Sequence, residues 1–112
     1  MEKLAQQGER MKVNEYAQLE LLRGQLQRVF AREFSEIDCL LTLTQQTTAN
    51  RLDQEPGMMK LTRSFNLTGQ PAISIPCGTS PAGMPIGLQL VCERGSDGLL
   101  LAIAARIATA LA

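Results

Sequence analysis

Serine, lysine and cysteine are the side chains of this sequence that could attack a carbonyl carbon, and there is no histidine to activate any of them. That absence excludes a Ser-His-Asp or a Cys-His arrangement. Lys60 stands four residues before Ser64. A lysine can act as the base for a serine only when it is desolvated, and the neighbouring Arg63 does not by itself desolvate it. No two serines are adjacent; they are Ser35, Ser64, Ser74, Ser80 and Ser96. We therefore predict no catalytic residue in this chain.

The remaining chemistry-bearing residues give equally weak signals. Cys77, between a proline and a glycine, would need Lys60 or Arg63 nearby to become a thiolate, so we interpret it as a small apolar residue at a strand end. The glycines around it lack the lysine-containing spacing of a phosphate-binding loop. The acidic residues Asp38, Asp53, Glu55 and Asp97 are scattered and have no histidine companions. We expect neither a cofactor nor a metal.

Composition narrows the class of protein. The 112 residues fit a single domain over 1–112. Eleven basic and eleven acidic residues cancel, which disfavours a nucleic-acid partner and favours association. The apolar stretch 99–112 is shorter than the roughly 17–25 residues of a membrane helix, and no signal peptide is visible. Three cysteines without CxxC spacing predict buried thiols in a reducing compartment. We therefore expect a cytoplasmic protein without a membrane partner.

The pattern along the chain predicts an α/β order of elements. Residues 1–36 are expected to be helical, 37–44 a buried strand, 45–69 a loop and a short helix, 70–92 two strands, and 96–112 a helix. Asn14 is a candidate cap for the long helix, whose apolar residues at three- and four-residue steps make one stripe: Leu19, Leu22, Leu26, Val29 and Phe30.

The region 70–92 carries two prolines and a glycine with positional meaning. Pro76 and Pro85 suit strand ends, because proline has no backbone donor. Two strands joined by the loop 77–84 are expected to pair antiparallel, although eight residues are long for a hairpin. Gly87 inside a strand indicates close approach by another backbone or side chain.

The last helix is apolar on nearly every side. Between Gly98 and Ala112 its only charged residue is Arg106. Leu100 belongs to one apolar stripe, and Leu101 lies on a second face that is almost as apolar. A helix of this kind is buried on more than one side. We infer a missing partner surface, supplied by another subunit or by the rest of a longer chain.

Residues 65–101 contain an N-L-T-G-x-P-A-I-S-x-P-C-G run, then a P-x-G-L-Q-L strand and a Ser-Asp start to an apolar helix. This order resembles the C-terminal part of the amidase signature family. The resemblance implies a fragment of a layered α/β/α fold, with about three strands of a mixed sheet packed with the long helix and the C-terminal helix. In that family a lysine and two serines from an upstream Gly/Ser-rich loop do the chemistry, and this chain has no such loop. Leu43 and Gln46 also stand where the family usually has prolines, which puts the path after Thr44 in doubt.

The same resemblance points to a substrate-binding segment just before Asn66. Carried over by position, Met59, Thr62, Arg63 and Phe65 lie near the family's acyl-side pocket. Arg63 is expected to pair with a substrate carboxylate and Phe65 to line an apolar wall. The plain alternative is a surface arginine and a core phenylalanine.

Three hypotheses follow. In the first, the chain is the C-terminal structural and substrate-pocket segment of an amidase that hydrolyses a carboxamide; it is inactive alone and needs the remainder of that fold or a second copy of itself as partner. The second is a self-standing, non-catalytic α/β module that oligomerises through its apolar C-terminal helix. The third is a split enzyme whose serines and lysine come from another chain. A small amide is expected as substrate only in the complete enzyme.

Overall fold

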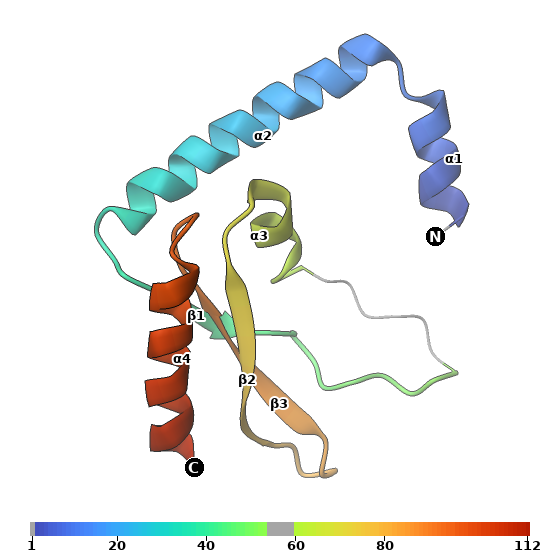
Figure 1. Ribbon diagram of the computed structural model, residues 1–112. Coiled ribbons are helices and arrows are strands. Elements are labelled where there is room, and N and C mark those ends of the chain that lie inside the picture. Colours follow the sequence, from blue (N-terminus) through green and yellow to red (C-terminus); the bar gives the residue numbers. More distant parts are fainter. Residues whose placement is uncertain (1, 54–59) are drawn as a thin grey trace.

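The computed structural model describes residues 2–53 and 60–112. Its elements in chain order are α1 (Glu2–Arg10), α2 (Val13–Phe34), β1 (Leu40–Leu43), α3 (Arg63–Thr68), β2 (Ala72–Thr79), β3 (Pro85–Val91) and α4 (Asp97–Leu111) (Figure 1). This is the mixed α/β class that the sequence predicts. Within the described residues, no helix is both long and apolar enough to cross a membrane.

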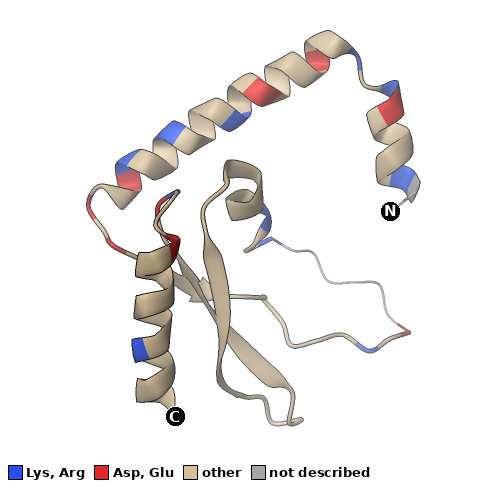
Figure 2. Cartoon of the chain, viewed as in Figure 1, with Lys and Arg blue, Asp and Glu red and all other residues tan. Residues whose placement is uncertain are grey.

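The three strands form one antiparallel sheet with β3 in the centre, in the order β1-β3-β2. Leu40 pairs with Val91 at one end of β1, and Ala72 of β2 pairs with Val91 on the other side. The antiparallel pairing predicted for the last two strands is confirmed. These three strands contain no charged residue, whereas the acidic and basic residues gather on the helices and connections (Figure 2).

Alternation along the strands divides the sheet into two packed faces. On one face Ile75, Leu90 and Cys92 pack against Leu100 and Ala104 of α4. On the opposite face the core contains Val91 with Phe34 of α2 and Phe65 of α3, and Phe30 and Leu40 pack against it. Helices therefore cover the sheet on both sides, in an α/β/α layering.

The hairpin between β2 and β3 is tighter than expected because β2 runs on to Thr79. Its turn is closed by two backbone bonds of 2.8 Å, from the Ser80 N–H to the Met84 carbonyl and from the Gly83 N–H to the Ser80 carbonyl. The prediction that Pro76 ends a strand is wrong. Pro76 lies inside β2, where the register shifts between Pro76 and Gly78. An edge strand with a bulge tolerates a residue without a donor, whereas Pro85 does begin its strand.

Helix α2 begins before the predicted cap residue. The Lys12 backbone N–H donates to the Glu15 carboxylate at 2.8 Å, and the helix starts at Val13. The expectation that Asn14 caps it is therefore wrong. The acidic side chain in the first turn instead accepts from the backbone N–H of Lys12, the residue before the helix.

The apolar stripe of α2 is largely uncovered. Val29 keeps 56% of its surface exposed, and Leu19 and Leu22 are about half exposed. The helix packs through its C-terminal end, where Phe30 and Phe34 join the core. A buried stripe, as the periodicity predicts, needs a layer that the described residues do not supply.

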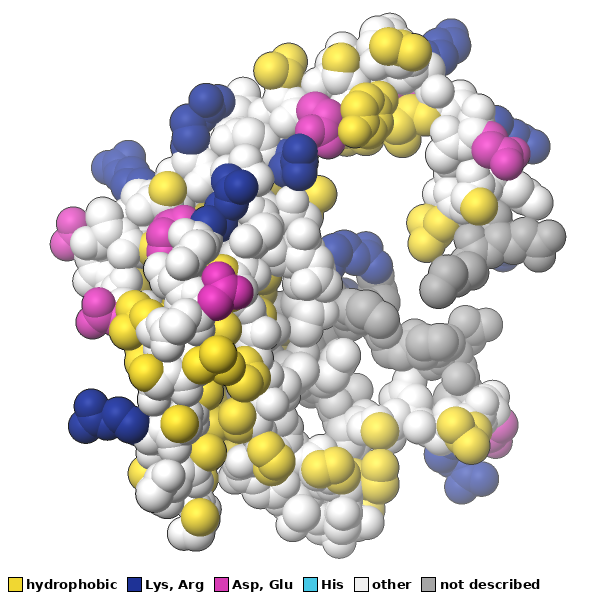
Figure 3. Space-filling view, viewed as in Figure 1, with side chains coloured by type: hydrophobic (Ala, Val, Ile, Leu, Met, Phe, Trp, Pro, Cys, Tyr) yellow, Lys and Arg dark blue, Asp and Glu magenta, His cyan; other side chains and the backbone are white. Residues whose placement is uncertain are grey.

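The whole chain is more open than a domain of its size. Its Cα radius of gyration is 16.9 Å, against roughly 13 Å for a compact domain of this length. It exposes 8816 Å², whereas a compact monomer of 12.2 kDa exposes about 6,100 Å². The excess includes apolar groups along α2 and on the outer face of α4 (Figure 3).

Candidate functional site

Helix α3 and its approach carry the residues expected to bind substrate. Thr62 is half-buried and precedes the helix, and Arg63 is its exposed first residue. Met59 lies outside the described residues. The structure therefore places Thr62 and Arg63 together at one end of α3, while their roles stay predictions.

Phe65 faces the interior. It is 6% exposed, and its ring lies 5.5 Å from that of Phe30 between centroids, tilted by 54°. Val91 and Phe34 complete the same cluster. In this chain Phe65 thus holds α3 against α2 and the sheet, as the plain alternative describes.

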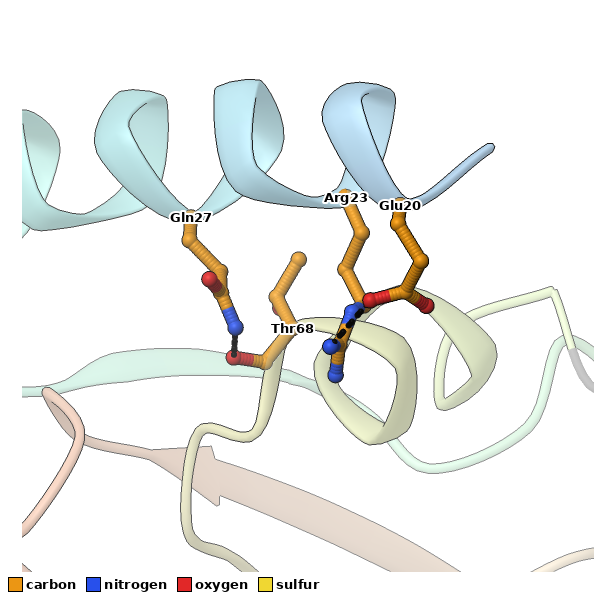
Figure 4. A network of polar contacts seen from close by, with 4 residues as sticks. All are labelled: Glu20, Arg23, Gln27 and Thr68. Atoms are coloured by element: carbon orange, nitrogen blue, oxygen red, sulfur yellow. Dashed lines mark hydrogen bonds and ion pairs between the residues drawn. The ribbon is translucent and has the colours of Figure 1, made fainter. Parts of the chain in front are cut away.

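Polar contacts fix α3 under α2. The Gln27 side-chain amide donates to the Thr68 carbonyl at 3.1 Å, and Arg23 forms an ion pair with Glu20 at 2.6 Å one turn away (Figure 4). The Thr68 hydroxyl donates to the Ser64 carbonyl at 2.7 Å within the helix. The exposed ion pair contributes little, because solvent screens it. The bond to the Thr68 carbonyl matters more, because it satisfies an acceptor at the helix end.

Gly69 ends α3 and turns the chain into β2. Its φ of 81° lies in the left-handed region, and its N–H donates to the Phe65 carbonyl at 2.8 Å. Glycine occupies this conformation without the steric cost of a Cβ. The N-L-T-G run is therefore the last turn of a helix and its left-handed cap.

Gln89 connects the sheet to the approach to α3. Its amide nitrogen donates to the Thr42 hydroxyl and to the Leu61 carbonyl, both at 2.9 Å, and the residue is 3% exposed. The second of these bonds holds the chain one residue before Thr62. Gln89 was not predicted from the sequence; the signal available was a polar residue at the centre of an otherwise apolar strand.

Two hydroxyls meet over Gly87 on the same face. The Oγ1 atom of Thr44, the residue directly after β1, and the Oγ atom of Ser74 in β2 lie 2.5 Å apart. A Cβ added at Gly87 would lie 2.6 Å from the Ser74 oxygen and 2.7 Å from the Thr44 oxygen. The close approach predicted at Gly87 is confirmed. A pocket of about 310 Å³ opens here, with Thr44, Ser74 and Gly87 beside apolar groups of Pro76 and Ile86.

The structure describes the surroundings of the groups considered as nucleophiles. Lys60 is exposed and precedes α3, on which Ser64 is also exposed. The Cys77 thiol donates to the Ile86 carbonyl at 3.5 Å. Burial first, then the Cys39 thiol and Asp38, raises the pKa of Cys92 to about 11, which keeps that thiol protonated. No group of three or more histidine, cysteine, aspartate or glutamate residues in the described part is placed to hold a metal.

These elements and their motifs match a known family. The model of the family described as Amidase matches residues 1–101. The chain belongs to the amidase family. The sheet, α3 and the start of α4 all fall within the matched range.

Individual members of the amidase family show how much of the chain is shared. It is 40% identical over 96 residues to the A-type subunit of glutamyl-tRNA(Gln) amidotransferase from Prochlorococcus marinus (strain MIT 9211), covering 80% of this chain and 20% of that protein. It is 52% identical over 54 residues to 6-aminohexanoate-cyclic-dimer hydrolase of Pseudomonas sp. (strain NK87), covering 48% of this chain and 11% of that protein.

The fold is shared as well. A crystal structure of an amidase superposes with a TM-score of 0.76 at 28% identity, over 83% of this chain and 24% of that one. The chain is therefore a mixed α/β fragment of the amidase signature fold. It spans about a fifth of the length of the first amidotransferase relatives it matches.

Proposed function

We propose that this chain is the C-terminal structural and substrate-pocket segment of a carboxamide-hydrolysing amidase, and that the nucleophile and its base come from the remainder of that fold. The observation that carries the proposal is the excess surface: 8816 Å² is exposed where about 6,100 Å² is expected. Apolar residues on α2 and α4 contribute to that excess. Surface of this kind normally marks an interaction site.

The remainder of an amidase accounts for these faces better than a second copy does. Two separate elements are uncovered, the stripe of α2 and the outer face of α4, where Leu101 is 60% exposed. The chain also spans only about a fifth of its amidotransferase relatives, so much of their fold lies outside the match. A two-fold dimer that forms through α4 would leave the apolar stripe of α2 exposed to solvent.

Within this role, we assign substrate contact to the end of α3. Arg63 is exposed there, and Gln89 fixes the residue before Thr62. An exposed guanidinium on a braced segment is suited to bind a carboxylate of the substrate. Phe65 contributes by anchoring the helix beneath. We also propose a cytoplasmic setting, because the three cysteines are free.

A chimera tests the proposal. This chain replaces the matching C-terminal region of 6-aminohexanoate-cyclic-dimer hydrolase, and amide hydrolysis is followed by release of amine. We expect no hydrolysis by the chain alone and restored hydrolysis by the chimera. Amide hydrolysis by the purified chain alone, or a folded chimera without activity, would contradict the proposal.

A matched pair of variants in the chimera tests the covered stripe. Val29→Glu introduces a charge into the exposed apolar stripe of α2, whereas Arg28→Glu changes its neighbour on another face. We expect Val29→Glu to abolish soluble, active chimera and Arg28→Glu to leave it unchanged, because burying an unpaired charge is costly. Equal tolerance of both changes would mean that nothing covers the stripe.

A further inference from the structure

Two cysteines far apart in the sequence lie next to each other at one end of the sheet. In the β1–β3 ladder Leu40 pairs with Val91. One more step of this antiparallel register places Cys39, just before β1, opposite Cys92, just after β3. Cys39 also packs against the apolar cluster that contains Cys92.

The hydrogen-bond pattern defines the type of this pair. The Thr44 N–H donates to the Gly87 carbonyl at 2.9 Å, so Thr44 and Gly87 form a hydrogen-bonded pair. Such pairs alternate with non-hydrogen-bonded ones along an antiparallel ladder. Counting back to Cys39 makes Cys39 and Cys92 a non-hydrogen-bonded pair, and the Cys92 N–H accordingly donates to the Pro71 carbonyl on the other side.

This geometry suits a covalent bridge. Non-hydrogen-bonded pairs bring their Cα atoms to about 4.5 Å and their side chains close together. Disulfides span Cα separations of about 4.4–6.8 Å. By the alternation of the strands, both thiols project to the face covered by α4. Cys39 is half-buried and Cys92 is fully buried, so an oxidant reaches the pair through Cys39.

We propose that Cys39 and Cys92 are a modification site that closes reversibly to an intramolecular disulfide when the chain meets a small disulfide such as oxidised glutathione. The Cys39 thiolate attacks one sulfur of the oxidant, forming a mixed disulfide and releasing one glutathione thiolate. The Cys92 thiol gives its proton to the glutathione thiolate released in the first step, attacks the Cys39 sulfur and releases the second glutathione. The two cysteines lose two electrons and two protons in total, and the oxidant becomes two thiols.

Closure ties the connection after α2 to the central strand. The bond links chain positions about 50 residues apart, so it restricts the unfolded chain strongly. We expect the melting temperature of the oxidised chain to exceed that of the reduced chain by at least about 8 °C.

Cys77 supplies a matched control. It bonds to the carbonyl of Ile86, near the start of β3, whereas Cys92 follows the other end of that strand. At the rise of an extended strand, six residues separate them by roughly 20 Å. The Cys77→Ser variant retains both thiols of the proposed pair. The Cys39→Ser and Cys92→Ser variants each retain Cys77 and one member of the pair, and the sheet keeps these two thiols far apart.

The test follows intramolecular disulfide formation in the three single variants of the folded chain under oxidised glutathione. Free thiols are alkylated at each time and counted by mass spectrometry. We expect Cys77→Ser to close at least about tenfold faster than the other two, since its thiols have the higher effective concentration. The same comparison in urea is expected to remove the difference. Equal rates for the three variants without urea, or faster closure of either control, would overturn the proposal.

Discussion

Helix α4 offers two adjacent leucines in opposite environments, and truncating each one tests how the helix is packed. Leu100 is 4% exposed and lies in the core against the sheet, whereas Leu101 is 60% exposed. Both changes to alanine have the same effect on intrinsic helix propensity, so their difference reports burial alone.

The magnitudes follow from the buried carbon atoms. Leu100→Ala removes three buried carbons at about 0.8 kcal/mol each, and the cavity left behind raises the loss to roughly 3–4 kcal/mol. Leu101→Ala removes the same atoms from a mostly solvent-exposed position, so we expect the free energy of unfolding to fall by about 1 kcal/mol or less. The difference in the free energy of unfolding should therefore be at least about 2 kcal/mol.

Urea unfolding followed by far-ultraviolet circular dichroism measures both changes, because the chain has no tryptophan to report by fluorescence. With a slope of roughly 1–1.5 kcal/mol per molar urea, Leu100→Ala should lower the midpoint by about 2 M or more. An equal loss from Leu101→Ala, with a midpoint that rises with protein concentration, would refute our account of the outer face. It would show instead that a second copy covers Leu101.

Three further changes test other contacts. Gly87→Ala should cost roughly 1–3 kcal/mol by thermal unfolding, because the added Cβ meets the Ser74 hydroxyl at 2.6 Å, and an unchanged melting temperature would contradict that approach. Gln89→Leu should cost about 1–3 kcal/mol and increase hydrogen exchange around α3, because the Leu61 carbonyl loses its donor; unchanged exchange would mean the bond does not hold this segment. Cys92 has a folded pKa of about 11 against 9.0 unfolded, so the unfolded state loses its proton first and stability falls between pH 9 and 11. The loss should be roughly 2 kcal/mol and absent in Cys92→Ala; equal pH profiles would place the titration elsewhere.

Local patterns predicted the elements well where the deciding interactions are close in sequence. The strand positions around Ile75 and Leu90 follow from short apolar runs between turn residues, and the close contact at Gly87 follows from a glycine inside a strand. The family motif over residues 65–101 also indicated the fold. These signals depend on the residue and its immediate neighbours.

The parts that escaped prediction depend on contacts between distant segments. Pro76 is tolerated inside β2 because that strand is at the edge and carries a bulge, which the spacing of prolines does not reveal. Gln89 reaches Thr42 and Leu61 from 47 and 28 residues away. The exposure of Val29 depends on a layer absent from the described residues, so periodicity alone indicated burial that the structure does not show.

The residues of the candidate site also divide into those whose position could be predicted from the sequence and those whose orientation could not. Arg63 and Thr62 were placed by resemblance, and the structure brings them to one end of α3, with Gln89 bracing the residue before them. Phe65 is expected on the same ground to line a pocket wall; its ring packs on Phe30, and its role toward a substrate stays a prediction. Sequence position could not show which way that ring points, because this depends on how α3 docks under α2.

The central claim is that this chain completes a larger amidase fold, and the most direct measurement is to read the coding DNA in frame upstream of Met1. We predict an open frame that soon encodes a Gly/Ser-rich loop with two serines and, further upstream, a lysine. An in-frame stop codon immediately before Met1 would contradict the claim and identify the chain as a small protein whose uncovered faces bind a separate partner.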